Sequence, residues 1–113
     1  MVLNHFAISI TFANMTIEQI KELTARVEAL GNFLSIEDKN QKIENDKQLS
    51  LSAGFWDDNV RATAILKEIK TNTFWVDLYH TVKLALEDFA VLFDFWKQGE
   101  ASEEEVKIAY QTA

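Results

Sequence analysis

The chain has no cysteine, no proline and only three glycines, Gly31, Gly54 and Gly99, among its 113 residues. Without cysteine, disulfide bonds and thiol chemistry are excluded. A fold rich in tight turns needs more proline and glycine than this. Because 48% of the residues are apolar, the chain can nevertheless form a core. The composition therefore predicts one domain built from a few long helices.

Basic residues are also scarce, and the formal net charge is −7. From residue 87 to residue 105, seven acidic residues stand against Lys97 alone, which indicates a solvated helix face or docking to a basic partner protein. This balance argues against direct nucleic-acid binding, which requires clustered Lys and Arg. The apolar residues 2–13 have no cation before them and are fewer than the ~20 residues that span a bilayer. We expect a cytoplasmic protein that does not bind membranes.

Motifs that carry chemistry are missing. The sequence has no glycine-rich phosphate loop, and its two histidines, His5 and His80, are far apart. His80 and Asp77 lie one helical turn apart, and such a pair is more often a surface contact than a catalytic or metal site. The Asp57-Asp58-Asn59 run lacks the glycine and the terminal glutamate of a calcium loop. We expect no enzymatic activity, no cofactor and no metal.

The first 14 residues differ in pattern from the rest of the chain. Large apolar residues alternate there with small ones, a period of two that is typical of a strand: Phe6, Ile8, Ile10 and Phe12. No second strand pattern exists to pair with it, and a lone strand is not stable. We expect residues 1–14 to be an extension that is disordered, docked in an apolar groove, or upstream of a natural start at Met15. The predicted domain is residues 15–113.

The first residue pattern that predicts the start of a helix is at Thr16. Thr16 and Gln19 have the spacing of a capping box, and Met15 and Ile20 could form the hydrophobic staple around it. An apolar seam then runs to the end of the predicted first helix through Ile20, Leu23, Val27, Leu30 and Leu34. Ser35 can cap a second helix over residues 36–52, which has few apolar residues and is expected to be mostly solvated.

A break at residues 53–56 separates this helix from a much longer one. Asp57 or Asp58 can cap a helix over residues 58–98, with a bend or a change of contact face at residues 71–73, and Gly99 ends it. Ser102 opens a short last helix through a second capping box. The sequence predicts an all-α fold, an elongated helical hairpin or bundle with one long central helix.

An aromatic seam dominates the long helix. Its members recur at alternating spacings of three and four: Trp75, Leu78, Val82, Ala85, Phe89, Leu92 and Trp96. The short last helix cannot cover this seam along its length. The seam could be internal core, a homodimer contact or a groove for a partner helix, and Phe55-Trp56 could plug the helix junction or form an exposed anchor. The candidate interaction residues are Phe55, Trp56, Trp75, Phe89 and Trp96.

Several residues resemble a known family. Phe55-Trp56-Asp57-Asp58 is followed by Arg61-Ala62, Ala64, Lys67 and Glu68, in the order found in the amino-terminal domain of bacterial peptide chain release factor 2. The surrounding matches are Met15-Thr16-Ile17, Ser35-Ile36-Glu37-Asp38, Tyr79, Val82-Lys83 and Glu87-Asp88. The resemblance covers residues 15–113 and leaves out the first 14 residues.

The resemblance implies a helical arm set apart from the decoding and catalytic core of a factor that reads UGA and UAA stop codons. In that family the arm reaches toward the base of the ribosomal stalk. The family's Gly-Gly-Gln hydrolysis motif and Ser-Pro-Phe codon-reading motif are absent here, and Asn59 replaces the proline usual after the junction aspartates. No catalytic residue is therefore carried over. The alternative prediction is a free-standing acidic helical adaptor for protein interactions.

Overall fold

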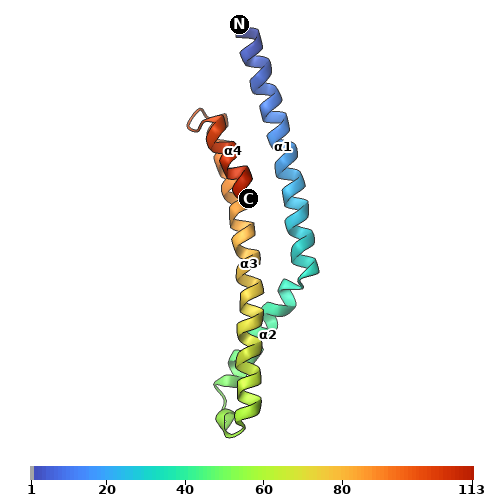
Figure 1. Ribbon diagram of the computed structural model, residues 1–113, viewed down its shortest axis with the longest axis vertical. Helices are drawn as coiled ribbons and strands as arrows, with labels where there is room; N and C mark the ends of the chain where they lie inside the picture. Colours follow the sequence, from blue (N-terminus) through green and yellow to red (C-terminus); the bar gives the residue numbers. More distant parts are fainter. Residues whose placement is uncertain (1) are drawn as a thin grey trace. The chain divides into compact units, whose positions relative to one another are not determined.

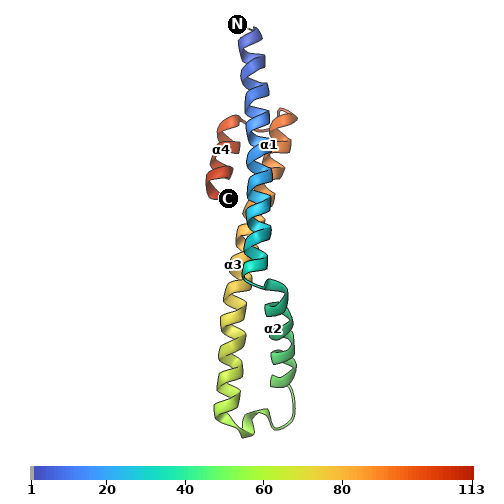
Figure 2. The same ribbon diagram turned by 90° about the vertical axis from the view of Figure 1, so that its right-hand side faces the viewer.

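The fold is all-α, as the composition and periodicity predicted. The computed structural model describes residues 2–113, and side chains from Ser9 onward. Its elements are α1 (Val2–Phe33), α2 (Ile36–Ser50), the 3₁₀ helix η1 (Phe55–Asp57), α3 (Asn59–Lys97) and α4 (Glu103–Thr112). They form two compact units (Figures 1 and 2). We call Leu30–Thr81 the hairpin unit, and Met1–Ala29 with Val82–Ala113 the three-helix unit.

In the hairpin unit, α2 and the first half of α3 run antiparallel, side by side, and are joined by the turn that contains η1 (Figure 2). Their contact is aliphatic: Ile36 and Ile43 of α2 and Val76 of α3 form one buried cluster, with Leu34 and Tyr79 packed on its edge. Ala62 is fully buried, so its small side chain allows close contact near the turn. Lys42 of α2 and Glu68 of α3 form an ion pair, with Nζ 3.4 Å from Oε1.

In the three-helix unit, the second half of α3 packs against α1, which belongs to this unit up to Ala29, and against α4 (Figure 1). The contacts are aromatic: the ring centroids of Phe12 and Trp96 lie 4.6 Å apart, and those of Phe89 and Tyr110 lie 5.5 Å apart. The buried side chains of this unit are Phe12, Thr16, Val27, Leu86, Phe89, Phe93 and Val106.

The start of α1 differs from the prediction. The period-two pattern does not form a strand, because α1 continues through residues 2–33 without a break at Thr16. Phe12 and Thr16, spaced four apart, extend the predicted apolar seam backward, and nothing in residues 2–15 terminates a helix. The Thr16 hydroxyl does not cap; it donates a 2.8 Å hydrogen bond to the carbonyl of Phe12, the bond a mid-helix threonine makes. The side chains of His5, Phe6 and Ile8 lie outside the described residues.

The connections around α2 confirm the predicted helix positions but not every cap. α2 ends at Ser50, two residues before the predicted end. Ser35 is its N-cap residue, but its backbone is left-handed, with φ 52°, and its side chain makes no capping hydrogen bond. The cap role predicted for the Ser35 side chain is therefore wrong. At the other connection, the Asp58 carboxylate does cap α3, accepting a 3.0 Å hydrogen bond from the backbone N–H of Arg61.

The predicted long helix is confirmed as α3, with 39 residues and no interruption at residues 71–73. The buried side of α3 changes further along, beyond Tyr79. Val76 is buried in the hairpin unit and Leu86 in the three-helix unit, and the two are about 80° apart around the helix. One straight seam therefore cannot stay buried along the whole of α3.

The end of α3 and the start of α4 match the prediction. Gly99 is left-handed at φ 79°, and the N–H groups of Gly99 and Glu100 donate to the carbonyls of Trp96 and Phe95, the hydrogen bonds of a Schellman motif. The Ser102 hydroxyl oxygen accepts a hydrogen bond from the Glu105 N–H at 3.2 Å, which caps α4. After this connection, α4 runs back along α3 (Figure 1).

Candidate functional site

The turn between α2 and α3 exposes an aromatic side chain. Gly54 adopts φ 79°, a conformation that favours glycine, and reverses the chain before η1. The Phe55 and Trp56 rings then meet edge to face with centroids 5.1 Å apart. Phe55 is half-buried, whereas Trp56 is 63% exposed. Two alternatives were predicted for this pair: packing into the helix junction or exposure as an anchor. Phe55 is packed at the junction, whereas Trp56 is exposed.

The first part of the predicted seam is also exposed. Trp75 and Leu78 lie in the hairpin unit with 38% and 45% of their surface accessible, and neighbouring Phe74 is 60% exposed. The Phe74 and Trp75 rings contact each other edge to face, with centroids 5.3 Å apart. These side chains form an apolar surface on α3 away from the Ile36, Ile43 and Val76 cluster. Trp75 therefore remains a candidate interaction residue.

The second part of the seam is internal packing. Phe89 is fully buried and its ring contacts Tyr110 of α4, so its assignment as an interaction residue is wrong. Trp96 is half-buried between Phe12 of α1 and Phe93, which it stacks on with centroids 5.6 Å apart. The sequence analysis did not identify Phe12 and Tyr110 as the residues that cover Trp96 and Phe89. Phe12 belonged to the supposed extension, and Tyr110 to a helix judged too short to cover the seam along its length.

The predicted surface pair on α3 is not formed as an ion pair. His80 and Asp77 are both exposed, and no salt bridge between them occurs among the described residues. The backbone carbonyl of Asp77 instead accepts a 3.0 Å hydrogen bond from the Thr81 hydroxyl. Among residues 9–113, whose side chains the structure describes, no group of three or more His, Cys, Asp or Glu is placed to hold a metal ion.

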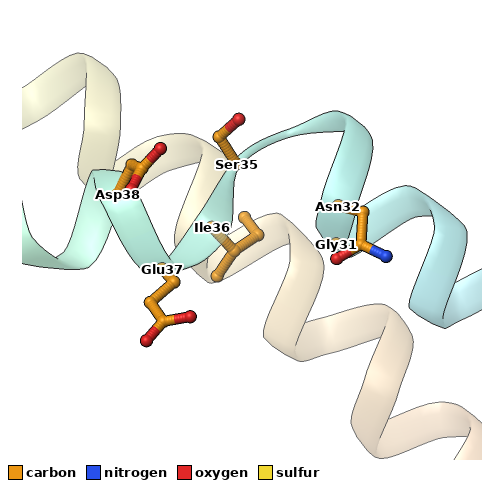
Figure 3. A pocket seen from close by; sticks show the side chains of 6 residues that line it. All are labelled: Gly31, Asn32, Ser35, Ile36, Glu37 and Asp38. Atoms are coloured by element: carbon orange, nitrogen blue, oxygen red, sulfur yellow. The ribbon is translucent and has the colours of Figure 1, made fainter.

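A small hollow lies at the kink between α1 and α2 (Figure 3). Its volume is about 220 Å³, smaller than the roughly 300–1,000 Å³ of pockets that enclose small-molecule ligands. The Glu37 and Asp38 side chains diverge in Figure 3 rather than converge on one point. The lining residues are Gly31, Asn32, Ser35, Ile36, Glu37 and Asp38. The hollow offers no arrangement for catalysis or ligand capture.

A polar cluster between α2 and α3 was not singled out in the sequence. Burial raises the pKa of the Asp46 carboxyl above its ordinary 3.8, the nearby charge of Glu68 raises that pKa further, and Lys42 opposes both. Oδ2 of Asp46 and Nδ2 of Asn72 are buried without a hydrogen-bond partner. The sequence did contain a sign of this cluster: Lys42 and Asp46 are four residues apart, as are Glu68 and Asn72, so each pair lies on one side of its helix. The sequence could not show that these two pairs face each other, because that depends on how α2 and α3 pack.

The comparisons with known proteins are negative. The chain matches no family model, no curated protein and no solved structure. Within residues 2–113, every helix is either too short or too polar to cross a lipid bilayer. The hairpin unit has exposed aromatic residues, among them Trp56, Phe74 and Trp75, and large exposed aromatic side chains are common at surfaces that contact another macromolecule.

Proposed function

We propose that this chain is the amino-terminal helical domain of a peptide chain release factor 2-like protein and acts in translation termination by contacting the ribosome. It does so in the cytoplasm, without an enzymatic activity of its own, and its contact lies at the base of the ribosomal stalk. The proposal rests on the residues from Phe55 to Glu68 that resemble the release factor family.

The geometry of four of those residues supports the proposal, because they shape the turn end of the hairpin or are exposed there. Asp58 caps α3, and Ala62 is fully buried in the unit. Trp56 and Arg61 point outward and are exposed. A motif that combines structural residues with an exposed tryptophan is expected where a turn both shapes a hairpin and meets a partner. The exposure of Trp56 is the single observation on which we base the contact.

Ribosome binding by the purified chain tests the proposal. The chain should sediment with bacterial ribosomes stalled at a UGA codon and should slow peptide release by an added full-length release factor. Replacing Trp56→Ala should weaken the binding about tenfold, the loss of roughly 1.4 kcal/mol expected when an interface aromatic is truncated. Phe74→Ala is the matched control, because Phe74 is 60% exposed in the same unit and lies outside the resembling motif.

Two results would contradict the proposal. The first is the absence of binding by a chain whose circular dichroism shows the expected helix content. The second is peptidyl-tRNA hydrolysis by the chain alone, because no residue of the hydrolysis motif is present. Equal loss of binding in the Trp56→Ala and Phe74→Ala variants would place the contact elsewhere than at the turn.

The alternative is a free-standing acidic helical adaptor that offers its apolar seam to another protein or to a second copy of itself, and one observation favours it. Trp75 and Leu78 remain partly exposed although they belong to the apolar seam of α3. A homodimer through this part of the seam would cover them. Sedimentation velocity distinguishes the two functions: a dimer that Trp75→Glu converts to monomer, without ribosome binding, favours the adaptor.

A further inference from the structure

The bend between α1 and α2 is made by one residue in an unfavourable conformation. Ser35 has φ 52° and ψ 50°, and it is the only non-glycine residue with a positive φ among residues 2–113. A residue with a Cβ atom adopts this left-handed conformation about 5–30-fold less readily than the right-handed helix. The Ser35 side chain makes no capping hydrogen bond, and in Figure 3 it points away from Ile36. Its own side chain therefore does not compensate for the strain.

The local sequence does not require a bend. Residues 32–53 contain neither glycine nor proline, and helix lies on both sides of Ser35. With Ser35 in the right-handed conformation, the Leu34 carbonyl could accept the backbone N–H of Asp38, and α1 and α2 would form one helix. In the bent form the Leu34 carbonyl accepts a hydrogen bond from the Lys39 ammonium group instead.

The bend follows from packing on α3. A straight helix would place Ile36 and Ile43 about 160–180° around its axis from Leu34, so these side chains could not contact one neighbour. In the bent form Ile36 and Ile43 form the aliphatic cluster with Val76 of α3, and Leu34 packs on it. Tertiary contact therefore selects the left-handed conformation of Ser35 against the local preference.

The segments on either side of α2 allow it to move. Before α2, Gly31 packs so closely on Tyr79 of α3 that a Cβ atom there would lie 3.0 Å from the ring, which holds the last turn of α1 on α3. After α2, residues 51–58 can extend to about 27 Å. α2 itself has 15 residues and is about 22 Å long. It can therefore leave α3 without unfolding of α3.

Polar groups between α2 and α3 oppose the closed hairpin. Burial and then the like charge of Glu68 raise the pKa of Asp46, so both disfavour the ionised carboxyl there, and Lys42 opposes them. Oδ2 of Asp46 and Nδ2 of Asn72 are buried without a hydrogen-bond partner, and both would gain water if α2 moved away. The aliphatic cluster is thus the main contact that keeps α2 on α3.

We propose that Ser35 is a strained hinge about which α2 swings off α3 as an intact helix, giving a minor state in which α1 and α2 form one continuous helix. The aliphatic cluster favours the closed state, and the left-handed serine favours the open one. Opening uncovers Val76 and Tyr79 of α3. The hinge does not depend on the proposed termination function.

Labelling of a buried thiol measures the open fraction. The chain has no cysteine, so Val76→Cys introduces a single thiol beneath α2. With dilute reagent, the labelling rate is proportional to the fraction of molecules in which the thiol is uncovered. In this background Ser35→Gly should slow labelling, because glycine adopts the left-handed conformation freely and is a poor helix former. Ser35→Ala favours the straight helix and should label at least about tenfold faster than Ser35→Gly.

Matched variants show that the effect belongs to the hinge. Val106→Cys places the thiol in the three-helix unit, where Val106 is 1% exposed, and its labelling should not differ between the two Ser35 variants. Lys39→Met removes a hydrogen bond that only the bent form makes and should speed labelling at Val76→Cys about 2–10-fold. Lys47→Met, at an exposed position of the same helix, should leave the rate unchanged.

Three results would overturn the proposal. Equal labelling of the Ser35→Gly and Ser35→Ala variants would mean that the conformation of this residue does not control opening. Equal acceleration at Val106→Cys would show that the whole chain unfolds. The third result comes from amide hydrogen exchange of residues 40–50: an intact helix keeps these amides more strongly protected than the thiol, so equal protection would mean that α2 unfolds rather than swings.

Discussion

The three-helix unit and the hairpin unit are stabilised by different kinds of contact. Aromatic side chains such as Phe89 and Phe93 fill the three-helix unit, where α3 is packed against both α1 and α4. The hairpin unit has two main helices and a smaller aliphatic cluster around Ile43 and Val76, and its helices also share the polar cluster of Asp46 and Glu68.

The difference follows from how many helices surround α3. A helix packed on two sides can bury large rings, each with roughly 150–250 Å² of surface, whereas a helix packed against one partner leaves a face in water. Trp75 and Leu78 are on such a face in the hairpin unit. We therefore expect the three-helix unit to respond most strongly to loss of packing, and the hairpin unit to respond to packing and to charge.

The largest effect is expected from Phe89→Ala. Phe89 is fully buried, and truncation of a buried phenylalanine costs about 3–5 kcal/mol of stability through lost burial and the cavity left behind. Urea unfolding followed by circular dichroism measures the cost. Amide hydrogen exchange should show the loss of protection concentrated in residues 82–113, because local opening follows local packing.

Val91→Ala is the matched control for Phe89→Ala. Val91 lies on the same helix half a turn further on, but it is 50% exposed, so its truncation should cost less than about 0.5 kcal/mol. Comparable losses in the two variants would mean that the aromatic packing of α3 does not distinguish its two sides.

Ile43→Ala should have the second-largest effect. Ile43 belongs to the aliphatic cluster of the hairpin unit and is nearly buried, so truncation should cost about 2–3 kcal/mol. The cost should be smaller than for Phe89→Ala, because fewer atoms are removed and the open side of the hairpin can relax. Hydrogen exchange should rise in residues 36–50. A cost above that of Phe89→Ala would reverse the comparison between the units.

Local signals in the sequence predicted most helix ends of both units. Gly99 and Ser102 act through their own backbone and side chain within a few residues, so their roles follow from the sequence directly. Thr16 shows the limit of this reasoning. Its capping box spacing is present, but capping also requires a non-helical residue there, and helix extends on both sides of it. The pairing of Phe12 with Trp96 is a contact between distant residues that no local pattern specifies.

The candidate site was predictable only in part for the same reason. Spacing placed Trp75, Phe89 and Trp96 on one line of α3, and all three are helical as expected. It could not tell which part of that line has a neighbouring helix. Phe89 is covered and Trp75 is not, because only the three-helix unit supplies helices on both sides. The turn at Phe55 and Trp56 depends on neighbouring residues such as Gly54, so its position could be predicted correctly from the sequence.

A smaller effect is expected from Ser102→Ala in the three-helix unit. The change removes the oxygen that accepts from the Glu105 N–H, a cap worth about 1 kcal/mol. Ser102→Thr keeps the oxygen and should lose only a few tenths of that amount. Thermal unfolding of the two variants checks the difference. If alanine and threonine behaved alike, the cap would contribute nothing to the docking of α4.

The smallest effect, and one of opposite sign, is expected from Asp46→Asn in the hairpin unit. Burial and the charge of Glu68 raise the pKa of Asp46, so the folded state disfavours its ionised form and loses stability as the pH rises through that raised pKa. Asn removes the charge and should stabilise the unit at pH 7, by less than about 1 kcal/mol because water screens the cluster. The gain should shrink as the pH falls toward 3.8, where the unfolded carboxyl also takes up its proton.

Urea unfolding at several pH values measures the gain. Asp38→Asn is the control: it removes a favourable charge from the first turn of α2 and should destabilise the unit instead. A gain for Asp46→Asn that did not depend on pH would show that the ionisation of Asp46 does not affect the stability of the hairpin unit.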